Sequence, residues 1–206
     1  MLKLYDMQRS GNAYKARLML GLLGIEHEKQ TVDLAKKEQM APWYLAVNPL
    51  HTVPVLDDDG VVIRDSAAVL IYLAAKYDKA RTWYPADPRG MAEVQQWLAY
   101  ANNEILNKLA LARAIGVGLR PGNLAEAQEA ARPVLAHINQ SLTGRDWLAG
   151  GNPTIADVAC YPYPALIGQA GITHDAYPAI AAWCRRIEGL KGYVALPPRP
   201  TPPPGA

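Results

Sequence analysis

The stretch TVPVLDDDGVVIRDSAAVLIYLAAKY, residues 52–77, decides which fold the chain can adopt. It contains two short runs rich in β-branched residues, and the acidic turn between them ends at Gly60, which is typical of a β-hairpin. From residue 66 to residue 77 the apolar side chains recur at helical spacing. We therefore expect a hairpin whose apolar face is covered by the helix that follows it.

The residues that precede the hairpin predict strands and helices in alternation. Apolar and polar side chains alternate over residues 2–5, and helical spacing follows over residues 13–24. Residues 27–34 predict a second strand, and residues 36–47 predict a short helix or an irregular segment. Residues 1–77 thus predict the order βαβαββα, with a mixed four-stranded sheet flanked by helices, which is thioredoxin-like.

The rest of the chain is predicted to be helical. Residues 78–90 carry two prolines and mixed charge, which indicates a linker. Beyond the linker, apolar residues recur at helical spacing in four segments, residues 91–115, 123–142, 154–170 and 177–190. Residues 91–206 therefore predict an all-helical bundle domain. Its proline-rich tail, residues 196–206, cannot be helical because proline removes backbone donors and fixes φ. The predicted fold class is α/β plus all-α.

Composition and charge argue against several classes of protein. The chain has 206 residues, 50% apolar content and a formal charge of only +2, which fits a soluble globular protein of one or two domains. The positive charge is neither large nor gathered in a run, which argues against a nucleic-acid partner. No basic leader with a long apolar region opens the chain, and no stretch of about 18 apolar residues follows, so we expect a cytoplasmic protein without a membrane partner.

The two cysteines do not indicate metal or dithiol chemistry. Cys160 and Cys184 form neither a CxxC motif nor a Cys/His cluster. We expect both to be buried structural thiols, and we expect no metal site.

Two predicted helix starts supply candidate binding groups. Ser10 and Asn12 stand where the first strand gives way to a helix, so the serine either caps that helix or touches a reacting atom. Asp65 and Ser66 stand where the hairpin meets its helix. Unpaired N–H groups and the helix dipole there suit a carboxylate, while the adjacent Asp could hold an ammonium, which together match an amino-acid head group. Plain helix capping is the alternative, and these residues alone favour it.

Two further motifs predict a local backbone structure. Pro54 stands at the entrance of a predicted strand, where the Val53–Pro54 peptide is either an ordinary edge-strand bond or a cis bond that turns the Val53 backbone toward a cleft. TIAD, from Thr154 to Asp157, resembles a capping box with Asp in place of Glu or Gln, and we interpret it as structural.

Taken together, four stretches resemble the cytosolic glutathione transferases: LYDMQRSGNAYKARLML, NPLHTVPVLDDDG, IRDSAAVLIYLAAKY and TIADVA. The resemblance covers nearly the whole chain, depends on the order and spacing of the stretches, and is to serine-type bacterial members. It implies a thioredoxin-like glutathione site, a cis peptide at Pro54 and a helical domain that walls the second-substrate pocket. It further implies a symmetric cytoplasmic homodimer with a role in detoxification.

The resemblance assigns chemistry to Ser10 and Asn12. Ser10 stands where serine-type members place the hydroxyl that hydrogen-bonds the glutathione sulfur, and Asn12 stands where some bacterial members of the disulfide-reducing type place an asparagine. A free thiol has a pKa of about 8.5, and these two groups with the positive end of the first helix could lower it by roughly two units, or about 3 kcal/mol.

The other matches concern binding. The backbone of Val53, which precedes Pro54, matches the residue that pairs with the cysteinyl part of glutathione. Asp65 and Ser66 match the residues that hold the γ-glutamyl end, although Asp is one methylene shorter than the Glu or Gln more often found there. His51 matches a histidine that insect delta-type members place near the glycyl carboxylate.

The second substrate is predicted to meet the long helix after the linker. Asn103, Asn107 and Arg113 lie on this helix, which lines the electrophile pocket in the family, and polarity of an exposed helix face is the alternative. The resemblance therefore implies a glutathione transferase that adds the thiolate of its co-substrate to a small electrophile. Two alternatives are a glutathione-dependent disulfide reductase and a non-catalytic binding or scaffold protein on the same fold.

Overall fold

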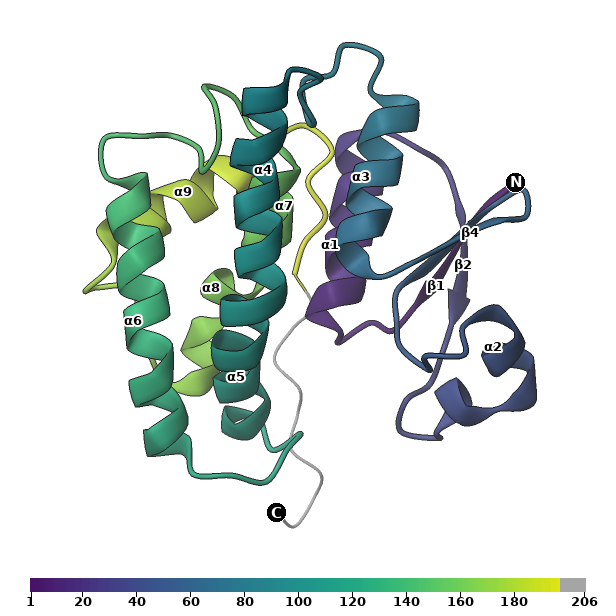
Figure 1. Cartoon of the computed structure of the whole chain (residues 1–206). Coiled ribbons are helices and arrows are strands. Elements are labelled where there is room, and N and C mark those ends of the chain that lie inside the picture. The colour runs from purple at the N-terminus through teal and green to yellow at the C-terminus, as the bar shows by residue number, and fades with distance from the viewer. Residues whose placement is uncertain (197–206) are drawn as a thin grey trace.

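The computed structural model describes residues 1–196 and contains the predicted sheet (Figure 1). Strands β1 (Leu2–Asp6), β2 (Glu28–Thr31), β3 (Val55–Asp58) and β4 (Val61–Arg64) form one sheet in the order β2-β1-β3-β4. β2 runs parallel to β1, whereas β1 with β3 and β3 with β4 are antiparallel. The mixed four-stranded sheet predicted from the sequence is confirmed. Apart from Leu196, the predicted proline-rich tail lies outside the described residues.

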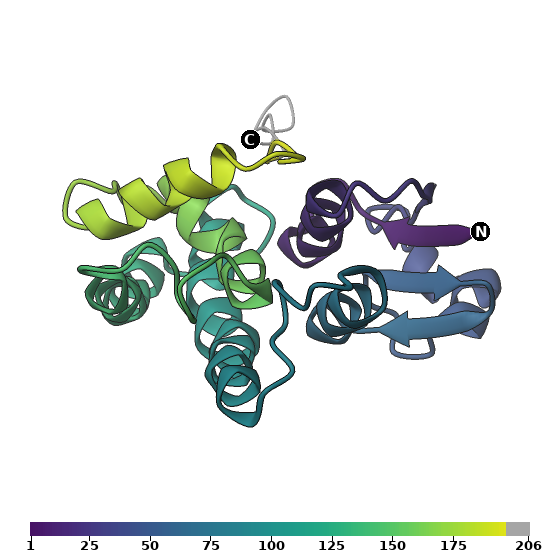
Figure 2. The same cartoon turned by 90° about the horizontal axis from the view of Figure 1, so that it is seen from above.

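Helices flank the sheet on both sides. α1 (Gly11–Leu22) and α3 (Ser66–Tyr77) lie side by side over one face, and α2 (Pro42–Val47) lies on the other (Figures 1 and 2). A short 3₁₀ turn, η1 (Glu38–Met40), leads into α2. Tyr44 of α2 packs into a small apolar cluster with Val55 of β3, while the face under α1 and α3 belongs to the main core.

The remaining elements are helical, as predicted. They are α4 (Pro88–Tyr100), the π-helical stretch η2 (Ala101–Ala110), α5 (Leu111–Gly116), α6 (Leu124–Leu142), α7 (Ile155–Cys160), α8 (Pro162–Ala165), the 3₁₀ turn η3 (Ile167–Ala170) and α9 (Pro178–Glu188). α4, η2 and α5 follow one another directly and form the long helix expected after the linker. α7 packs against both α1 and α3, so the sheet half and the helical half share one hydrophobic core.

The helix after the linker begins earlier than its apolar spacing predicts. α4 starts at Pro88, inside the predicted linker 78–90. The side chain of Asp87 accepts a hydrogen bond from the Gly90 N–H at 2.8 Å. Proline at the first helical position needs no N–H partner, so this cap and Pro88 together start the helix before its apolar face begins.

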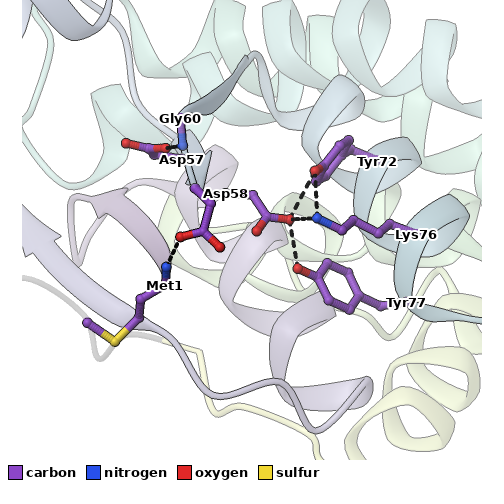
Figure 3. Close-up of polar contacts among 8 residues, drawn as sticks. Met1, Asp57, Asp58, Gly60, Tyr72, Lys76 and Tyr77 are labelled. Atoms are coloured by element: carbon purple, nitrogen blue, oxygen red, sulfur yellow. Dashed lines mark hydrogen bonds and ion pairs between the residues drawn. The ribbon is translucent and has the colours of Figure 1, made fainter.

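A buried carboxylate ties the hairpin to α3 (Figure 3). Asp58, at the end of β3, accepts hydrogen bonds from the hydroxyls of Tyr72 and Tyr77 at 2.9 and 2.7 Å and from Lys76 Nζ at 2.5 Å. All three donors lie on the last turns of α3 and converge on the same carboxylate oxygen. The hairpin and the C-terminal end of α3 are therefore held at a fixed angle, which also fixes the direction of the helix that starts at Ser66.

The end of the described chain returns to the first helix. After α9 the backbone passes beside α1 (Figure 1), and the Tyr14 hydroxyl donates a hydrogen bond to the Val194 carbonyl at 2.6 Å. A Cβ on Gly21 would lie 2.5 Å from the Gly192 carbonyl oxygen, so the close approach of the two backbones requires glycine at position 21. The C-terminal segment thus packs directly on α1.

The capping box predicted at TIAD is confirmed. Thr154 caps α7, and Asp157 accepts the Thr154 N–H at 2.9 Å. The same carboxylate accepts the Leu148 N–H at 3.0 Å and the Trp183 indole N–H at 2.9 Å, so it joins three segments of the helical half. Burial raises the pKa of Asp157 to about 6, against the effect of these hydrogen bonds.

Replacing this carboxylate leaves buried donors without a partner. We expect Asp157→Ala to lower the free energy of unfolding by about 3 to 5 kcal/mol, because the Trp183 and Leu148 donors stay in the core. Asp87→Ala removes an exposed cap of the same residue type and should cost about 1 kcal/mol. Urea unfolding of both variants measures the difference, and equal losses would contradict a buried structural role for Asp157.

Candidate functional site

The loop between β1 and α1 is fixed by an arginine from its own helix. Arg17 of α1 pairs with Asp6 at the end of β1, and both side chains are almost fully buried. The same guanidinium donates to the carbonyl of Gln8 at 3.0 Å and to that of Met7 at 3.4 Å. The carbonyls of Met7 and Gln8 therefore point back toward Arg17.

A second arginine fixes the next carbonyl from the helical half. Arg113 of α5, one of the predicted second-substrate residues, is 4% exposed. Its Nη1 donates to the Arg9 carbonyl at 3.3 Å, and its Nε donates to the Gln169 side chain at 2.8 Å. Arg113 thus holds the residue immediately before Ser10.

Ser10 is the N-cap of α1. Its Oγ accepts the Ala13 N–H at 3.2 Å, as the capping interpretation predicts. A hydroxyl has one donor in addition to its acceptor lone pairs, so capping uses an acceptor site and leaves the O–H able to donate to a ligand. Capping of α1 and contact with a reacting atom are compatible functions of this side chain.

Asn12 and Gly11 form the first turn of α1. The Oδ1 atom of Asn12 is buried and has no hydrogen-bond partner among residues 1–196. A Cβ on Gly11 would lie 2.6 Å from Cζ of Tyr163, so the ring of this α8 residue rests directly on the helix start. The helical half therefore borders the site that begins at Ser10.

The peptide between Val53 and Pro54 is cis, as the resemblance implies. Thr52, the residue before Val53, is held by two side chains. Its carbonyl accepts hydrogen bonds from the Tyr44 hydroxyl at 2.5 Å and from the Asn48 side-chain amide at 2.8 Å. The Val53 backbone is consequently placed by hydrogen bonds made one residue earlier.

Asp65 and Ser66 lie at the start of α3. Asp65 is exposed, has a φ of 76°, and accepts the N–H groups of Ala67 and Ala68 at 2.8 and 3.3 Å. Ser66 is buried, and its Oγ has no partner within the described residues. His51, in contrast, is exposed, with a φ of 46°, and only its backbone N–H is bound, to Asn48.

Buried polar atoms without partners are concentrated around these helix starts. Within residues 1–196, five buried side-chain N or O atoms have no hydrogen-bond partner, and four of them belong to Asn12, Lys15, Ser66 and Arg113. Buried polar groups in folded proteins are nearly always satisfied, so this concentration makes the two helix starts the candidate site for a polar ligand. Three of these four residues are ones that the sequence singled out.

Lys15 is the exception that the sequence did not single out. It lies on α1 one turn after Gly11, is 1% exposed, and its Nζ lies 5.8 Å from the centroid of the Tyr163 ring. Burial lowers the pKa of this ammonium to about 8, while the nearby Asp65 carboxylate acts in the opposite direction. Within residues 1–196 this ammonium has no ion-pair partner, and it provides positive charge near the starts of α1 and α3.

The remaining candidates lie on the long helix and separate into two groups. Asn103 and Asn107 are exposed, and their side chains hydrogen-bond each other at 3.2 Å. Asn107 also lines a hollow of about 370 Å³, together with Leu106, Ala110, Leu111, Ala114 and Arg120. Arg113 does not line this hollow and turns toward the Arg9 carbonyl.

Sequence patterns alone do not reveal every residue that shapes the site. Lys15 had a readable signal, since a lysine stands among apolar residues in the predicted helix 13–24. Asn48 and Tyr44 hold the Thr52 carbonyl within one short stretch of chain, but no sequence pattern marks this contact. The contact of Tyr163 with Gly11 joins segments that are far apart in the sequence.

The described part of the chain contains neither a group of metal ligands nor a membrane-spanning helix. Within residues 1–196, no three His, Cys, Asp or Glu side chains are grouped as a metal site requires. None of the helices in this range combines the length and apolar character needed to cross a bilayer.

Comparison with known proteins identifies relatives for both halves. Residues 9–76 match the family model for the glutathione S-transferase N-terminal domain, and residues 121–186 match that for the C-terminal domain. Glutathione S-transferase theta-1 of Rattus norvegicus is 31% identical over 179 residues, which cover 82% of this chain and 74% of the rat protein.

Solved structures agree with these matches. A glutathione S-transferase from Pseudomonas fluorescens superposes with a TM-score of 0.88 at 31% identity, covering 95% of this chain and 98% of its own. Another, from Xanthobacter autotrophicus, superposes with a TM-score of 0.87 at 30% identity, covering 96% of this chain and 98% of its own. The chain therefore belongs to the glutathione S-transferase family of enzymes.

Proposed function

We propose that the starts of α1 and α3 bind glutathione and activate its thiol as a thiolate for attack on a small electrophile. The observation that carries this proposal is the cluster of unpartnered buried atoms on Asn12, Lys15, Ser66 and Arg113. A thiolate is the nucleophilic form of a thiol, and donors at a helix N-terminus lower its pKa. The Ser10 hydroxyl and the Asn12 amide are the donors nearest the start of α1.

The other predicted residues would hold the peptide around its sulfur. The Val53 backbone would pair with the cysteinyl part, and Asp65 and Ser66 would hold the ammonium and carboxylate of the γ-glutamyl end. The exposed Asp65 carboxylate keeps a lone pair free beyond its capping bonds, and the unpartnered Ser66 hydroxyl supports the same assignment. His51 would lie near the glycyl carboxylate.

The reaction needs no group beyond the two substrates. The thiol proton leaves to solvent, the sulfur lone pair forms a bond to the electrophilic carbon, and the leaving group or π electrons accept the displaced pair. The hollow of about 370 Å³ beside Asn107 is the candidate pocket for the electrophile, because four of its six lining residues are Leu or Ala, which suit a small carbon skeleton.

The oligomeric state, the location and the biological role of the enzyme are also part of the proposal. We propose that the enzyme works as a homodimer in the cytoplasm, with Cys160 and Cys184 as buried free thiols suited to a reducing compartment. Conjugation of small electrophiles makes detoxification the role that fits this chemistry.

The first prediction about the proposed function concerns thiolate formation. Titration of the protein with glutathione near pH 7, in buffers of different ionisation enthalpy, should show release of close to one proton. Ser10→Ala should raise the pKa of the bound thiol by about one unit, because one donor to a charged acceptor is lost.

Two controls separate the hydroxyl's chemistry from its capping role. Ser10→Thr keeps the cap and the O–H and should retain proton release, whereas Asp87→Ala weakens a distant cap without affecting the thiol. Glutathione binding without proton release in the unaltered protein would contradict thiol activation.

The second prediction concerns the γ-glutamyl end. Asp65→Asn keeps the Oδ1 acceptor for the Ala67 N–H but removes the charge that faces the ammonium. We expect the KM for glutathione to rise about tenfold, equivalent to 1.4 kcal/mol, with kcat and the thiol pKa unchanged. A glutathione analogue without the α-amino group should bind the unaltered protein and Asp65→Asn equally well. Tighter binding of this analogue to the unaltered protein would show that the ammonium of glutathione lies away from Asp65.

The third prediction concerns the free energy of unfolding that is lost by burying the Lys15 ammonium. The lowered pKa of Lys15, about 8 against an ordinary 10.5, corresponds to roughly 3 kcal/mol at 1.36 kcal/mol per pKa unit. Lys15→Met should therefore raise the stability of the unliganded protein by about 1 to 3 kcal/mol at pH 7 and weaken glutathione binding about fivefold.

The pH dependence supplies an independent check. Because the folded state holds the Lys15 proton less tightly than the unfolded state, stability of the unaltered protein should gain from this group as pH rises from about 8 to about 10.5. Lys15→Met should lack that gain, and Lys29→Met, at an exposed strand position, should keep it. A destabilised Lys15→Met protein at pH 7 would show that the ammonium has a partner after all.

A further inference from the structure

Tyr163, from the helical half, brings its hydroxyl to the first turn of α1. The ring is 5% exposed, and a Cβ on Gly11 would lie 2.6 Å from its Cζ and 2.8 Å from its Oη. No larger residue than glycine at position 11 leaves room for the ring in this place. The phenol therefore lies against Gly11, the residue between Ser10 and Asn12, at the end of the helix where a ligand anion is favoured.

The hydroxyl meets one of the free backbone donors of that helix end. Burial raises the pKa of the phenol to about 12, and the Arg113 charge and the Asn12 backbone N–H act in the opposite direction. The phenol thus stays protonated near neutrality. It keeps one O–H donor, which can serve an acceptor at the start of α1.

Two cations lie near the Tyr163 ring. Lys15 Nζ lies over the ring at 5.8 Å from its centroid, and the charge of Arg113 favours negative charge at Tyr163. Each of these residues has a buried nitrogen without a hydrogen-bond partner within residues 1–196. Asp65 and Cys160 face Lys15, and Arg9 faces Arg113. The two cations beside the ring favour an anionic acceptor for its hydroxyl.

We propose that Tyr163 is a further catalytic residue, whose hydroxyl donates a hydrogen bond to the sulfur of bound glutathione beside that of Ser10. The inference builds on the proposed function and assigns one sulfur donor to each half of the molecule. The thiol proton still leaves to solvent, and Tyr163 keeps its own proton as the donor in the hydrogen bond. Activation of the thiol then depends on how the helical half is seated against α1.

The test is Tyr163→Phe, which keeps the ring on Gly11 and removes only the hydroxyl. The thiolate of bound glutathione is followed by its ultraviolet absorbance as pH is varied, together with kcat and KM for an aryl halide. We expect the pKa of the bound thiol to rise by about one unit, so that kcat/KM falls about tenfold below that pKa and recovers at high pH. A loss of stability alone would not produce this recovery.

A matched control lies two residues away. Tyr161 belongs to the same segment, but its hydroxyl bonds Glu188 at 3.1 Å and Tyr193 at 2.8 Å, away from Gly11. Tyr161→Phe should leave the thiol pKa unchanged, and an equal shift in both variants would overturn the proposal, since the effect would then be structural.

The outcomes also separate this inference from the function on which it rests. If Ser10→Ala raises the thiol pKa and Tyr163→Phe does not, the role of Tyr163 is overturned and thiol activation stands. If the unaltered protein forms no thiolate with glutathione, both are overturned. A shift in each single variant, with a larger shift in the double variant, would support two donors at one sulfur.

Discussion

The buried pair between Asp6 and Arg17 is the interaction on which the arrangement of the site depends. Removing two charges from water is costly, and a buried ion pair often contributes little net stability. Here the same guanidinium also binds the carbonyls of Met7 and Gln8, so the pair fixes the path of the chain from β1 into α1. Without that path, the helix start, its cap at Ser10 and its free N–H groups would not face the proposed glutathione site.

The site draws on both halves of the molecule. Arg113 holds the Arg9 carbonyl and Tyr163 covers Gly11, so the N-terminal end of α1 is shaped by residues more than a hundred positions away. Several polar atoms are buried there without partners, which lowers the stability of the unliganded fold. A ligand that satisfies them recovers part of that free energy, so glutathione should stabilise the fold by mass action.

Local signals in the sequence located most of the fold and part of the site. The helix predicted at residues 66–77 has those bounds in the structure, because its cap at Asp65 and its apolar spacing are both local. Ser10, Pro54 and Asp65 were singled out for the same reason, since a helix start or a strand entrance is visible in a few residues. The lysine at position 15 is visible among apolar residues, but its burial, like the contact of Tyr163 with Gly11, arises only when distant segments pack on α1. The start of α4 was misplaced because Asp87 and Pro88 begin the helix before any apolar periodicity appears.

The hydrogen bond between Tyr14 and Val194 determines when the contacts of α1 can be completed during synthesis. A hydroxyl on the first helix takes its acceptor from a carbonyl 180 residues later. During synthesis the sheet and its helices emerge first, whereas the Val194 carbonyl emerges only 180 residues after Tyr14. The thioredoxin-like half is therefore made before all the contacts of α1 can form, and α1 gains this hydrogen bond only after residue 194 has been added.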